Sequence, residues 1–180
     1  MDDVLELRPA VAAEAAEISM LLARAWRENY AEFLGGYRTE RLIARYCTVE
    51  RISAEIGATG AGDGWLGWVI ARADGELAGA GAGGITTVGS GEVYTLCTSG
   101  KHGHLDVGGA LMRAVTRQQL ERGAEQQWVA VYGENDPMYP FFVSHGFAPE
   151  QAAAPAAEEE DGPGLLRLHR TVRDTAGSRT

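Results

Sequence analysis

The chain has 180 residues, of which 45% are hydrophobic and 23% charged, and its formal net charge is −9 at pH 7. This length suits one domain with a buried core, and the apolar content excludes global disorder. The acidic balance argues against nucleic acid or an anionic membrane as the main partner. It fits a cationic substrate better, although net acidity is also a common way to keep a protein soluble.

The two cysteines, Cys47 and Cys97, are too few for a disulfide scaffold, and no paired Cys/His spacing points to a metal site. We therefore expect a reducing, cytoplasmic setting. The residues that follow Met1 are acidic, so we expect no secretory signal there, and no apolar run approaches the length of a membrane span.

The first part of the chain predicts one strand followed by two helices. Residues 4–8 alternate apolar and charged side chains and end at Pro9, which is typical of a short strand. Helical spacing follows, and Gly35-Gly36 interrupts it. The predicted elements are a strand at 4–8, a helix at 12–30, a second helix at 40–56 and a loop at 57–64.

A hairpin is predicted next, because Asp74-Gly75 is a strong two-residue turn signal between the strand at 65–73 and a strand that starts at Glu76. Glycine and alanine are unusually frequent from Ala78 to Gly84, which weakens the prediction of a strand there.

The second half alternates strands and helices. In order, it predicts a strand at 92–98, a helix at 107–122, a strand at 127–132, a short helix at 137–145 ending at Gly146, a polar loop at 151–164, a strand at 165–172 and a frayed tail at 174–180. The order β-αα-βββ-α-β-α-β indicates a mixed α/β (α+β) sheet in a single domain over residues 1–173, antiparallel first and locally parallel later.

The most informative segment runs from Leu96 to Met112, where a strand passes through a glycine-containing loop directly into an amphipathic helix. Gly108 and Gly109 have no Cβ, so they let a ligand approach the backbone closely. Free N–H groups and the helix dipole at such a helix start can bind phosphate or pyrophosphate. The alternative is a tight strand-to-helix turn that binds nothing.

This segment resembles the cofactor motif of the GNAT superfamily of acyl-CoA-dependent N-acetyltransferases. The spacing from Leu96 matches, with Gly103, His104, Asp106 and Gly108 at the four motif positions. The resemblance extends over nearly the whole chain, from about residue 4 to about residue 172. It also rests on Leu7 to Ala10, Trp26, Tyr30, the strand Trp128 to Tyr132, Asn135, Phe141-Phe142 and Gly146-Phe147.

The resemblance implies a GNAT-like fold in which the fourth and fifth strands splay apart and the pantetheine arm of acetyl-CoA fills the gap. It implies direct transfer of acetyl to a primary amine, on a small molecule or a protein. Leu96, Cys97 and Thr98 would pair with the pantetheine, and Asn135 and Phe142 would lie along it. Backbone amides would hold the pyrophosphate at Gly103, His104, Leu105, Asp106, Val107, Gly108 and Gly109. Dimers are frequent in that family, so a homodimer stays open.

Two motif positions depart from the family pattern, because His104 and Asp106 stand where glycines are usual. Asp106 is also a good N-cap, and its carboxylate could take the N–H groups that a phosphate needs. Lys101, His102 and His104 could offset this charge. The alternative is a helix that has lost its anion site, in a degenerate CoA-binding or regulatory module without turnover.

The catalytic groups are also open. Many family members use a tyrosine as general acid at the position of Phe142, which cannot donate a proton. Tyr139, three residues earlier on the same short helix, is the replacement we expect, with Tyr132 and Tyr94 as further candidates. Glu92 lies where the histone-acetylating branch carries its glutamate base, and Glu134 is a second choice.

The helix with Trp26 and Tyr30 and the loop at 57–64 would form the acceptor side, because the family builds acceptor sites from such segments. A different phosphorylated ligand is a third possibility, but the chain has no Gly-Lys-Ser/Thr run, so nucleotide hydrolysis is not expected.

Overall fold

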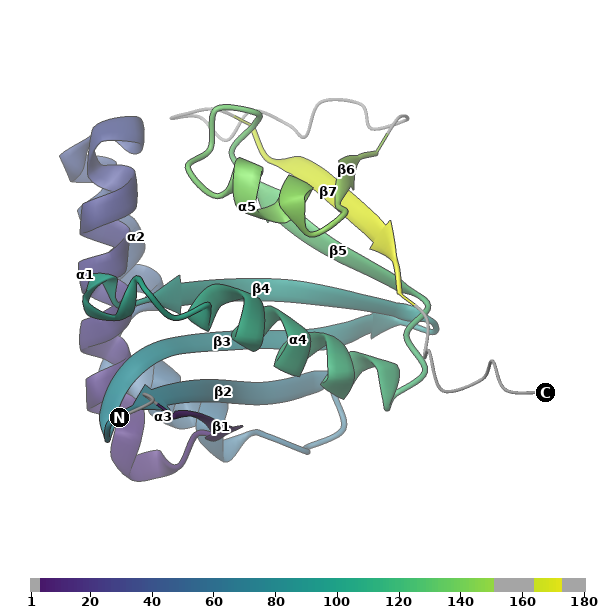
Figure 1. The fold of residues 1–180 in the computed structure, drawn as a ribbon, viewed down its shortest axis with the longest axis horizontal. Coiled ribbons are helices and arrows are strands. Elements are labelled where there is room, and N and C mark those ends of the chain that lie inside the picture. The colour runs from purple at the N-terminus through teal and green to yellow at the C-terminus, as the bar shows by residue number, and fades with distance from the viewer. Residues whose placement is uncertain (1–3, 151–163, 173–180) are drawn as a thin grey trace.

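The computed structural model describes residues 4–150 and 164–172. It contains a seven-stranded mixed sheet in the order β1-β2-β3-β4-β5-β7-β6 (Figure 1). The strands are β1 (Leu5–Pro9), β2 (Trp65–Ala73), β3 (Glu76–Thr87), β4 (Ser90–Thr98), β5 (Gln126–Val131), β6 (Ala148–Pro149) and β7 (Leu166–Thr171). The helices are α1 (Ala15–Leu34), α2 (Gly36–Tyr46), α3 (Val49–Gly57), α4 (Val107–Leu120) and α5 (Tyr139–Ser144), with short 3-10 turns η1 (Ala12–Glu14) and η2 (Gly100–His102).

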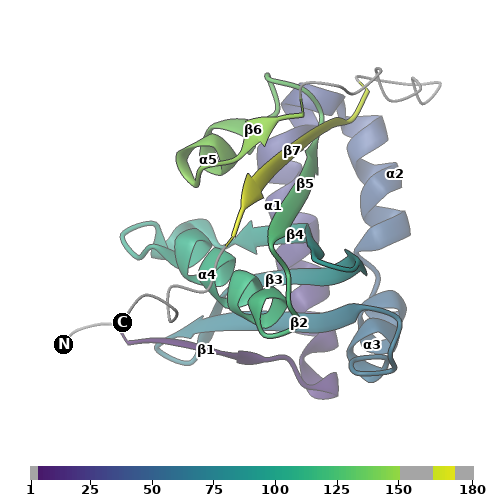
Figure 2. The same ribbon diagram turned by 90° about the vertical axis from the view of Figure 1, so that its right-hand side faces the viewer.

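Helices cover both faces of the sheet (Figure 2). One apolar cluster joins the sheet to α4 and α5 and includes Leu111 and Phe142. A second cluster, on the side of α1, α2 and α3, includes Ile18, Ile43 and Ile52. The only parallel pair among the described strands is β4–β5. The predicted mixed α/β class is therefore confirmed.

The helix predicted at 40–56 is wrong, because the structure forms two helices there, α2 and α3. The hydroxyl of Thr48 accepts a hydrogen bond from the N–H of Arg51 at 3.2 Å and caps α3, which stops α2 from continuing. Helix α1 also runs beyond the predicted Tyr30 and ends at Gly35, whose φ of 84° needs a residue without a Cβ.

The predicted order also lacks the short strand β6, which pairs with β7. The predicted tail at 174–180 and all but the end of the polar loop at 151–164 lie outside the described residues. No helix in the described part of the chain is both long and apolar enough to cross a membrane.

The glycine-rich stretch that weakened the strand prediction is the middle of β3. A Cβ on Gly79 would lie 2.8 Å from side-chain atoms of Leu111 and Val107, and one on Gly83 would lie 2.7 Å from Val115. All three neighbours belong to α4, so these glycines let the helix pack directly on the strand backbone. The opposite face of β3 carries alanines of the second cluster. The packing of α4 therefore stabilises a strand that local propensity disfavours.

Strands β4 and β5 pair only from Ser90–Gln126 to Val93–Val129, and beyond these residues they diverge (Figure 1). A register shift in the β3–β4 ladder occurs at the same place, between the Gly83–Val93 and Ala82–Thr95 pairs, so Tyr94 is an extra residue in β4. The bulge turns β4 away from its parallel neighbour. The splayed strands that the family resemblance implied are present.

Candidate active-site cavity

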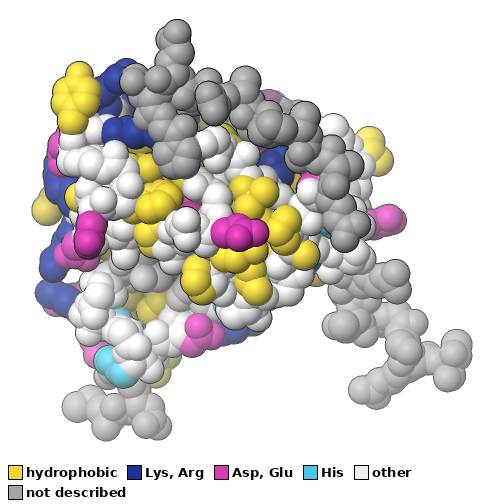
Figure 3. All heavy atoms as spheres, turned by 90° about the horizontal axis from the view of Figure 1, so that it is seen from above, with side chains coloured by type: hydrophobic (Ala, Val, Ile, Leu, Met, Phe, Trp, Pro, Cys, Tyr) yellow, Lys and Arg dark blue, Asp and Glu magenta, His cyan; other side chains and the backbone are white. Residues whose placement is uncertain are grey.

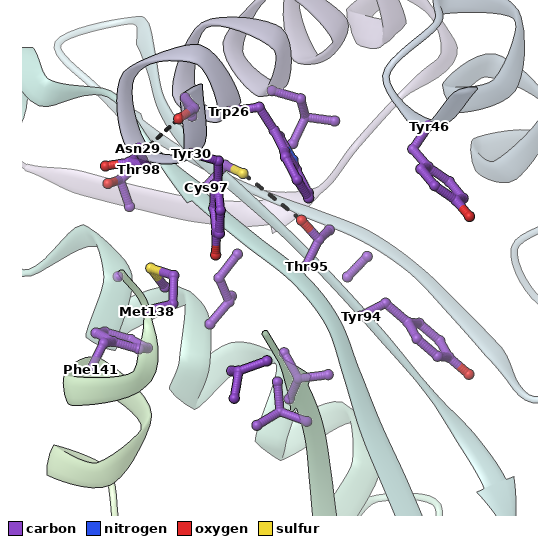
Figure 4. Close-up of a pocket in the computed structure, with 18 of the residues that line it drawn as sticks. Trp26, Asn29, Tyr30, Tyr46, Tyr94, Thr95, Cys97, Thr98, Met138 and Phe141 are labelled. Carbon is purple, nitrogen blue, oxygen red and sulfur yellow. Dashed lines mark hydrogen bonds between the residues drawn. The ribbon is translucent and has the colours of Figure 1, made fainter. Parts of the chain in front are cut away.

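A cavity of about 1030 Å³ opens where β4 and β5 separate. Its walls come from β4, β5 and the start of α4, and from α1, α2, α3 and the loop before β2. Figure 4 labels side chains of α1, α2 and β4 around it, together with Met138 and Phe141. The predicted site residues that line it are Trp26, Tyr30, Glu92, Leu96, Cys97, Thr98, Gly103, Leu105, Asp106, Val107, Gly108 and Phe142. Four others, His104, Gly109, Asn135 and Tyr139, are not among its described lining residues.

The start of α4 offers one free backbone donor to this cavity. Oδ1 of Asp106 accepts from the N–H of Gly109 at 3.0 Å, and the carbonyl of Asp106 accepts from Ala110 at 3.0 Å. The N–H of Val107 donates to the carbonyl of Leu105 at 2.8 Å. In the first helical turn only the N–H of Gly108 has no acceptor among the described residues. The predicted phosphate site therefore has fewer free N–H donors than expected, because the N–H of Gly109 already donates to the Asp106 cap.

The charge of Asp106 is offset by a residue that the sequence did not indicate. Nη1 of Arg113, two turns along α4, lies 3.2 Å from the Asp106 carboxylate. Lys101 instead lies 3.4 Å from Glu76, and His104 is exposed. The imidazole of His102 lines the cavity, with Nε2 3.8 Å from the same Glu76 carboxylate.

Glu92 places a carboxylate in the cavity at the last paired residues of β4. Its side chain is 22% exposed, and the nearest described cation is the guanidinium of Arg167 at 4.0 Å. Arg167 lies over the ring of Trp128 at 4.5 Å, which holds it beside the strand. No described group donates a hydrogen bond to the Glu92 carboxylate, so its oxygens are open to a hydrogen bond from a ligand.

The tyrosines are distributed differently from the expectation. Tyr139 packs against the α4-side core, and the buried ring of Phe142 contacts that of Phe147 at 5.5 Å between centroids. Tyr30, Tyr94 and Tyr132 do line the cavity. The place where the family carries its tyrosine is therefore a packed aromatic core here.

Asp136 was missed by the sequence reasoning, which favoured the neighbouring Asn135. Asn135 is exposed, whereas Asp136 is 2% exposed and lines the cavity. Its carboxylate accepts from the hydroxyl of Tyr30 at 3.0 Å, from the N–H of Tyr132 at 2.8 Å and from the N–H of Met138 at 2.7 Å. The Asn-Asp-Pro sequence is a turn signal that could have indicated this residue.

The bond between Tyr30 and Asp136 connects α1 to the turn before α5 across the cavity. Burial, followed by the charge and hydrogen bond of Asp136, raises the pKa of Tyr30 well above its ordinary value. Tyr30 therefore stays protonated and donates to Asp136, which makes it a poor general acid. Burial, together with the charges of Glu92 and Asp63, likewise raises the pKa of Tyr94.

The wall of the cavity that the sequence assigned to the acceptor includes Trp26 and Tyr30, whose rings stack at 4.7 Å between centroids (Figure 4). Further along, the ring of Tyr94 stacks on that of Trp65 at 6.0 Å. Glu55 of α3 accepts from Nε1 of Trp68 at 2.9 Å, which ties α3 to β2. The sequence indicated the 57–64 loop for this wall but not Tyr46, Arg51, Glu55, Trp65 or Trp68, which also line it.

Negative charge predominates in the cavity. Its described lining includes the carboxylates of Glu55, Asp63, Glu92, Asp106 and Asp136 and one guanidinium, that of Arg51. Most Lys and Arg side chains visible from above gather on the outer edge of the molecule, where α1 and α2 lie in Figure 1 (Figure 3). The charge of the described lining therefore favours a cationic ligand group over an anionic one.

Cys97 lines the cavity from β4, with its Sγ 3.8 Å from Oγ1 of Thr95 (Figure 4). Burial raises the pKa of this thiol to about 12. A protonated thiol is a weak nucleophile, so Cys97 is a packing residue here. Among the described residues, no group of three or more His, Cys, Asp or Glu side chains is placed to hold a metal ion.

The described residues thus combine a splayed β4–β5 pair, a helix start at the opening of the cavity and a carboxylate on β4. The acetyltransferase (GNAT) family model matches residues 19–147. The chain therefore belongs to the GNAT acetyltransferase family. No curated protein sequence matches it significantly.

Solved structures share this fold at low sequence identity. PaiA N-acetyltransferase from Thermoplasma acidophilum, in complex with coenzyme A, matches with a TM-score of 0.79 at 18% identity, over 94% of this chain and 99% of that one. A GCN5-related N-acetyltransferase from Rhodopseudomonas palustris matches with 0.74 at 17%, over 96% and 99%. YncA from Salmonella typhimurium, with its cofactor acetyl-CoA, matches with 0.69 at 15%, over 98% and 99%.

Proposed function

We propose that the protein is an N-acetyltransferase that moves an acetyl group from acetyl-CoA to a primary amine by direct transfer in a ternary complex. The observation that carries this proposal is that one cavity holds the splayed strand, the free N–H at the start of α4 and the Glu92 carboxylate. The family membership supports the same reaction class.

The residues of the cavity fit coenzyme A. Beyond Val93, the backbone of β4 is no longer paired with β5, so Leu96 and Thr98 can bond an extended pantetheine arm. The N–H of Gly108 and the dipole of α4 can hold a phosphate oxygen. The Asp106 carboxylate would repel the phosphate, and the guanidinium of Arg113 beside it weakens this repulsion. The bound cofactor would supply the acetyl group as an activated thioester.

Glu92 has the role of general base. A free alkylamine has a pKa of about 10.4, so it must lose a proton before its lone pair can attack the thioester carbonyl. The Glu92 carboxylate can take that proton, directly or through water. The C–N bond then forms as the C–S bond breaks, and the leaving thiolate needs a proton. Tyr139 would have to move to supply it, so Tyr132, which lines the cavity, is the candidate that the geometry favours.

The acceptor is a primary amine of a small molecule or of a protein, and the excess of carboxylates in the cavity favours a cationic one. Trp26 and the aromatic pair Tyr94–Trp65 would contact its carbon chain. We propose no role for nucleic acid or membranes. A cytoplasmic setting and a homodimer stay predictions.

The test combines calorimetry with thiol release. Titration with acetyl-CoA should show binding, and a panel of primary amines should release free CoA thiol in amounts equal to the acetylated product. Glu92→Gln, which keeps the shape of the side chain, should bind acetyl-CoA normally and release little thiol. Absence of heat at millimolar acetyl-CoA would contradict the proposal.

A second candidate is a CoA-binding module without turnover. Two observations favour it: the packed ring of Phe142 stands where the family carries its acid, and Asp106 occupies the N–H of Gly109. Acetyl-CoA binding without thiol release across the amine panel would support this candidate over the enzyme.

A further inference from the structure

A buried polar network lies on the α4 side of the sheet, where β4 and β5 begin to separate. Its side chains are Thr116 and Gln119 of α4, Gln127 of β5 and Arg170 of β7. Gln119 and Gln127 are completely buried. The proposed transfer reaction uses neither of them, and buried amides are costly unless each polar atom is bonded.

The hydrogen bonds of this network run in one direction. The guanidinium of Arg170 has donors only, and its Nε donates to Oε1 of Gln127 at 2.7 Å. The NH₂ group of Gln127 must then point the other way, and it donates to Oε1 of Gln119 at 2.8 Å. The NH₂ group of Gln119 in turn donates to the carbonyl of Glu92 at 2.9 Å and to that of Gly84 at 3.2 Å. A donor-only cation thus fixes the rotation of both amides.

The sheet leaves space for the Gln119 amide. A Cβ on Gly91 would lie 2.5 Å from both Cδ and Oε1 of Gln119, and a Cβ on Gly83 would lie 2.8 Å from its Nε2. Any larger residue at Gly91 would displace the amide. Two glycines on adjacent strands therefore form a seat for this side chain.

The Gln119 amide lies at the point where β4 and β5 begin to separate. Glu92 and Val93 are the last residues of β4 that pair with β5, and the Gln119 amide holds the carbonyl of Glu92. Side chains alternate along a strand, so while Gly91 faces Gln119, the Glu92 side chain emerges on the opposite face, in the cavity. The network and the candidate base are joined through one peptide unit.

We propose that Gln119 is a positioning residue: its amide, oriented by Arg170 through Gln127, anchors the backbone of Glu92 and so sets both the place of the base and the opening of the cofactor cleft. The part of this inference that concerns the base rests on the proposed function. The part that concerns the backbone of β4 does not.

The test compares Gln119→Met, which keeps an unbranched side chain without the amide, with Ile18→Ala. Ile18 is a fully buried residue of α1 that does not line the cavity, so its truncation controls for lost stability. Amide hydrogen exchange over residues 92–98, acetyl-CoA affinity, and kcat and KM for the amine are measured for each. If Gln119→Met does not fold, Gln127→Met takes its place. This change removes the acceptor of Arg170 Nε and the donor to Thr116 and Gln119, and it leaves the Gln119 amide present but no longer oriented.

Gln119→Met should exchange faster at residues 92–98 and should lower kcat between about tenfold and a hundredfold, the range for a small misplacement of a catalytic group. KM for the amine should change little, because the acceptor wall is untouched. Ile18→Ala should keep wild-type exchange over 92–98. The proposal is overturned if Gln119→Met keeps wild-type exchange there, or if Ile18→Ala gives the same losses. If the wild type transfers no acetyl group, the proposed function fails, while the exchange comparison still decides the role of Gln119.

Discussion

Replacing Asp106 with asparagine tests whether the start of α4 binds a phosphate group. Asparagine caps a helix as well as aspartate does, so the bond to the N–H of Gly109 should survive while one negative charge is lost. The Asp106 side chain is 70% exposed, so solvent screens its charge. A charge at an exposed helix end is worth about 0.3–1 kcal/mol, so Asp106→Asn should bind acetyl-CoA about two- to fivefold more tightly.

The assay is calorimetric titration with acetyl-CoA at low and high salt. The gain should shrink at an ionic strength of about 1 M, where the screening length falls to about 3 Å. Glu121→Gln is the matched control, because it removes the same charge from the cap at the other end of α4 and should leave the affinity unchanged. Unchanged or weaker binding by Asp106→Asn, or an equal gain in the control, would refute a phosphate site at this helix start.

Three further changes test other parts of the structure. Glu92→Gln should lower kcat/KM by about a hundredfold or more, and wild-type kcat/KM in the variant would rule out Glu92 as the base. Gly108→Glu should abolish acetyl-CoA binding in calorimetry, because it adds a charge where the free N–H lies and a Cβ 3.1 Å from Phe141; retained affinity would place the phosphate elsewhere. A hydrogen bond from Arg8, with further ones from the N–H of Val11 and from Arg72, lowers the pKa of Glu14 from 4.5 to about 2. The buried Glu14 carboxylate therefore stabilises the fold above pH 4.5, by up to about 3 kcal/mol, and this contribution is lost as the pH falls towards 2. Urea unfolding of Glu14→Gln should therefore show lower stability at neutral pH and a weaker acid dependence, and parallel pH curves for the two proteins would contradict this.

The residues that the sequence assigned to the cofactor are contiguous in the chain. A strand that enters a helix through a loop fixes the neighbourhood of Leu96 to Gly108 locally, and the structure brings most of these residues to one cavity. The sequence also identified the order of most strands and helices, since each has its own hydrophobic period. It did not separate α2 from α3, because the apolar spacing continues through the Thr48 cap.

The acceptor wall and the polar network required the tertiary structure. Glu55 and Trp68 meet through packing of α3 on β2, and Tyr30 reaches Asp136 from 106 positions away in the chain. No local period encodes such pairs. The same holds for the choice between Asn135 and Asp136, which depends on which side chain turns toward the buried N–H groups.

The sequence by itself therefore determined the fold class, the family and the strand-to-helix segment that we propose for the cofactor, because these depend on local periodicity and spacing. Only the tertiary structure decided why the strand β3 carries glycines and that the backbone of Glu92 is held where β4 and β5 separate. Each of these depends on a close approach between distant elements. Glycines at 79, 83 and 91 permit that approach, but the need for glycine at these positions is seen only once α4 is packed against them.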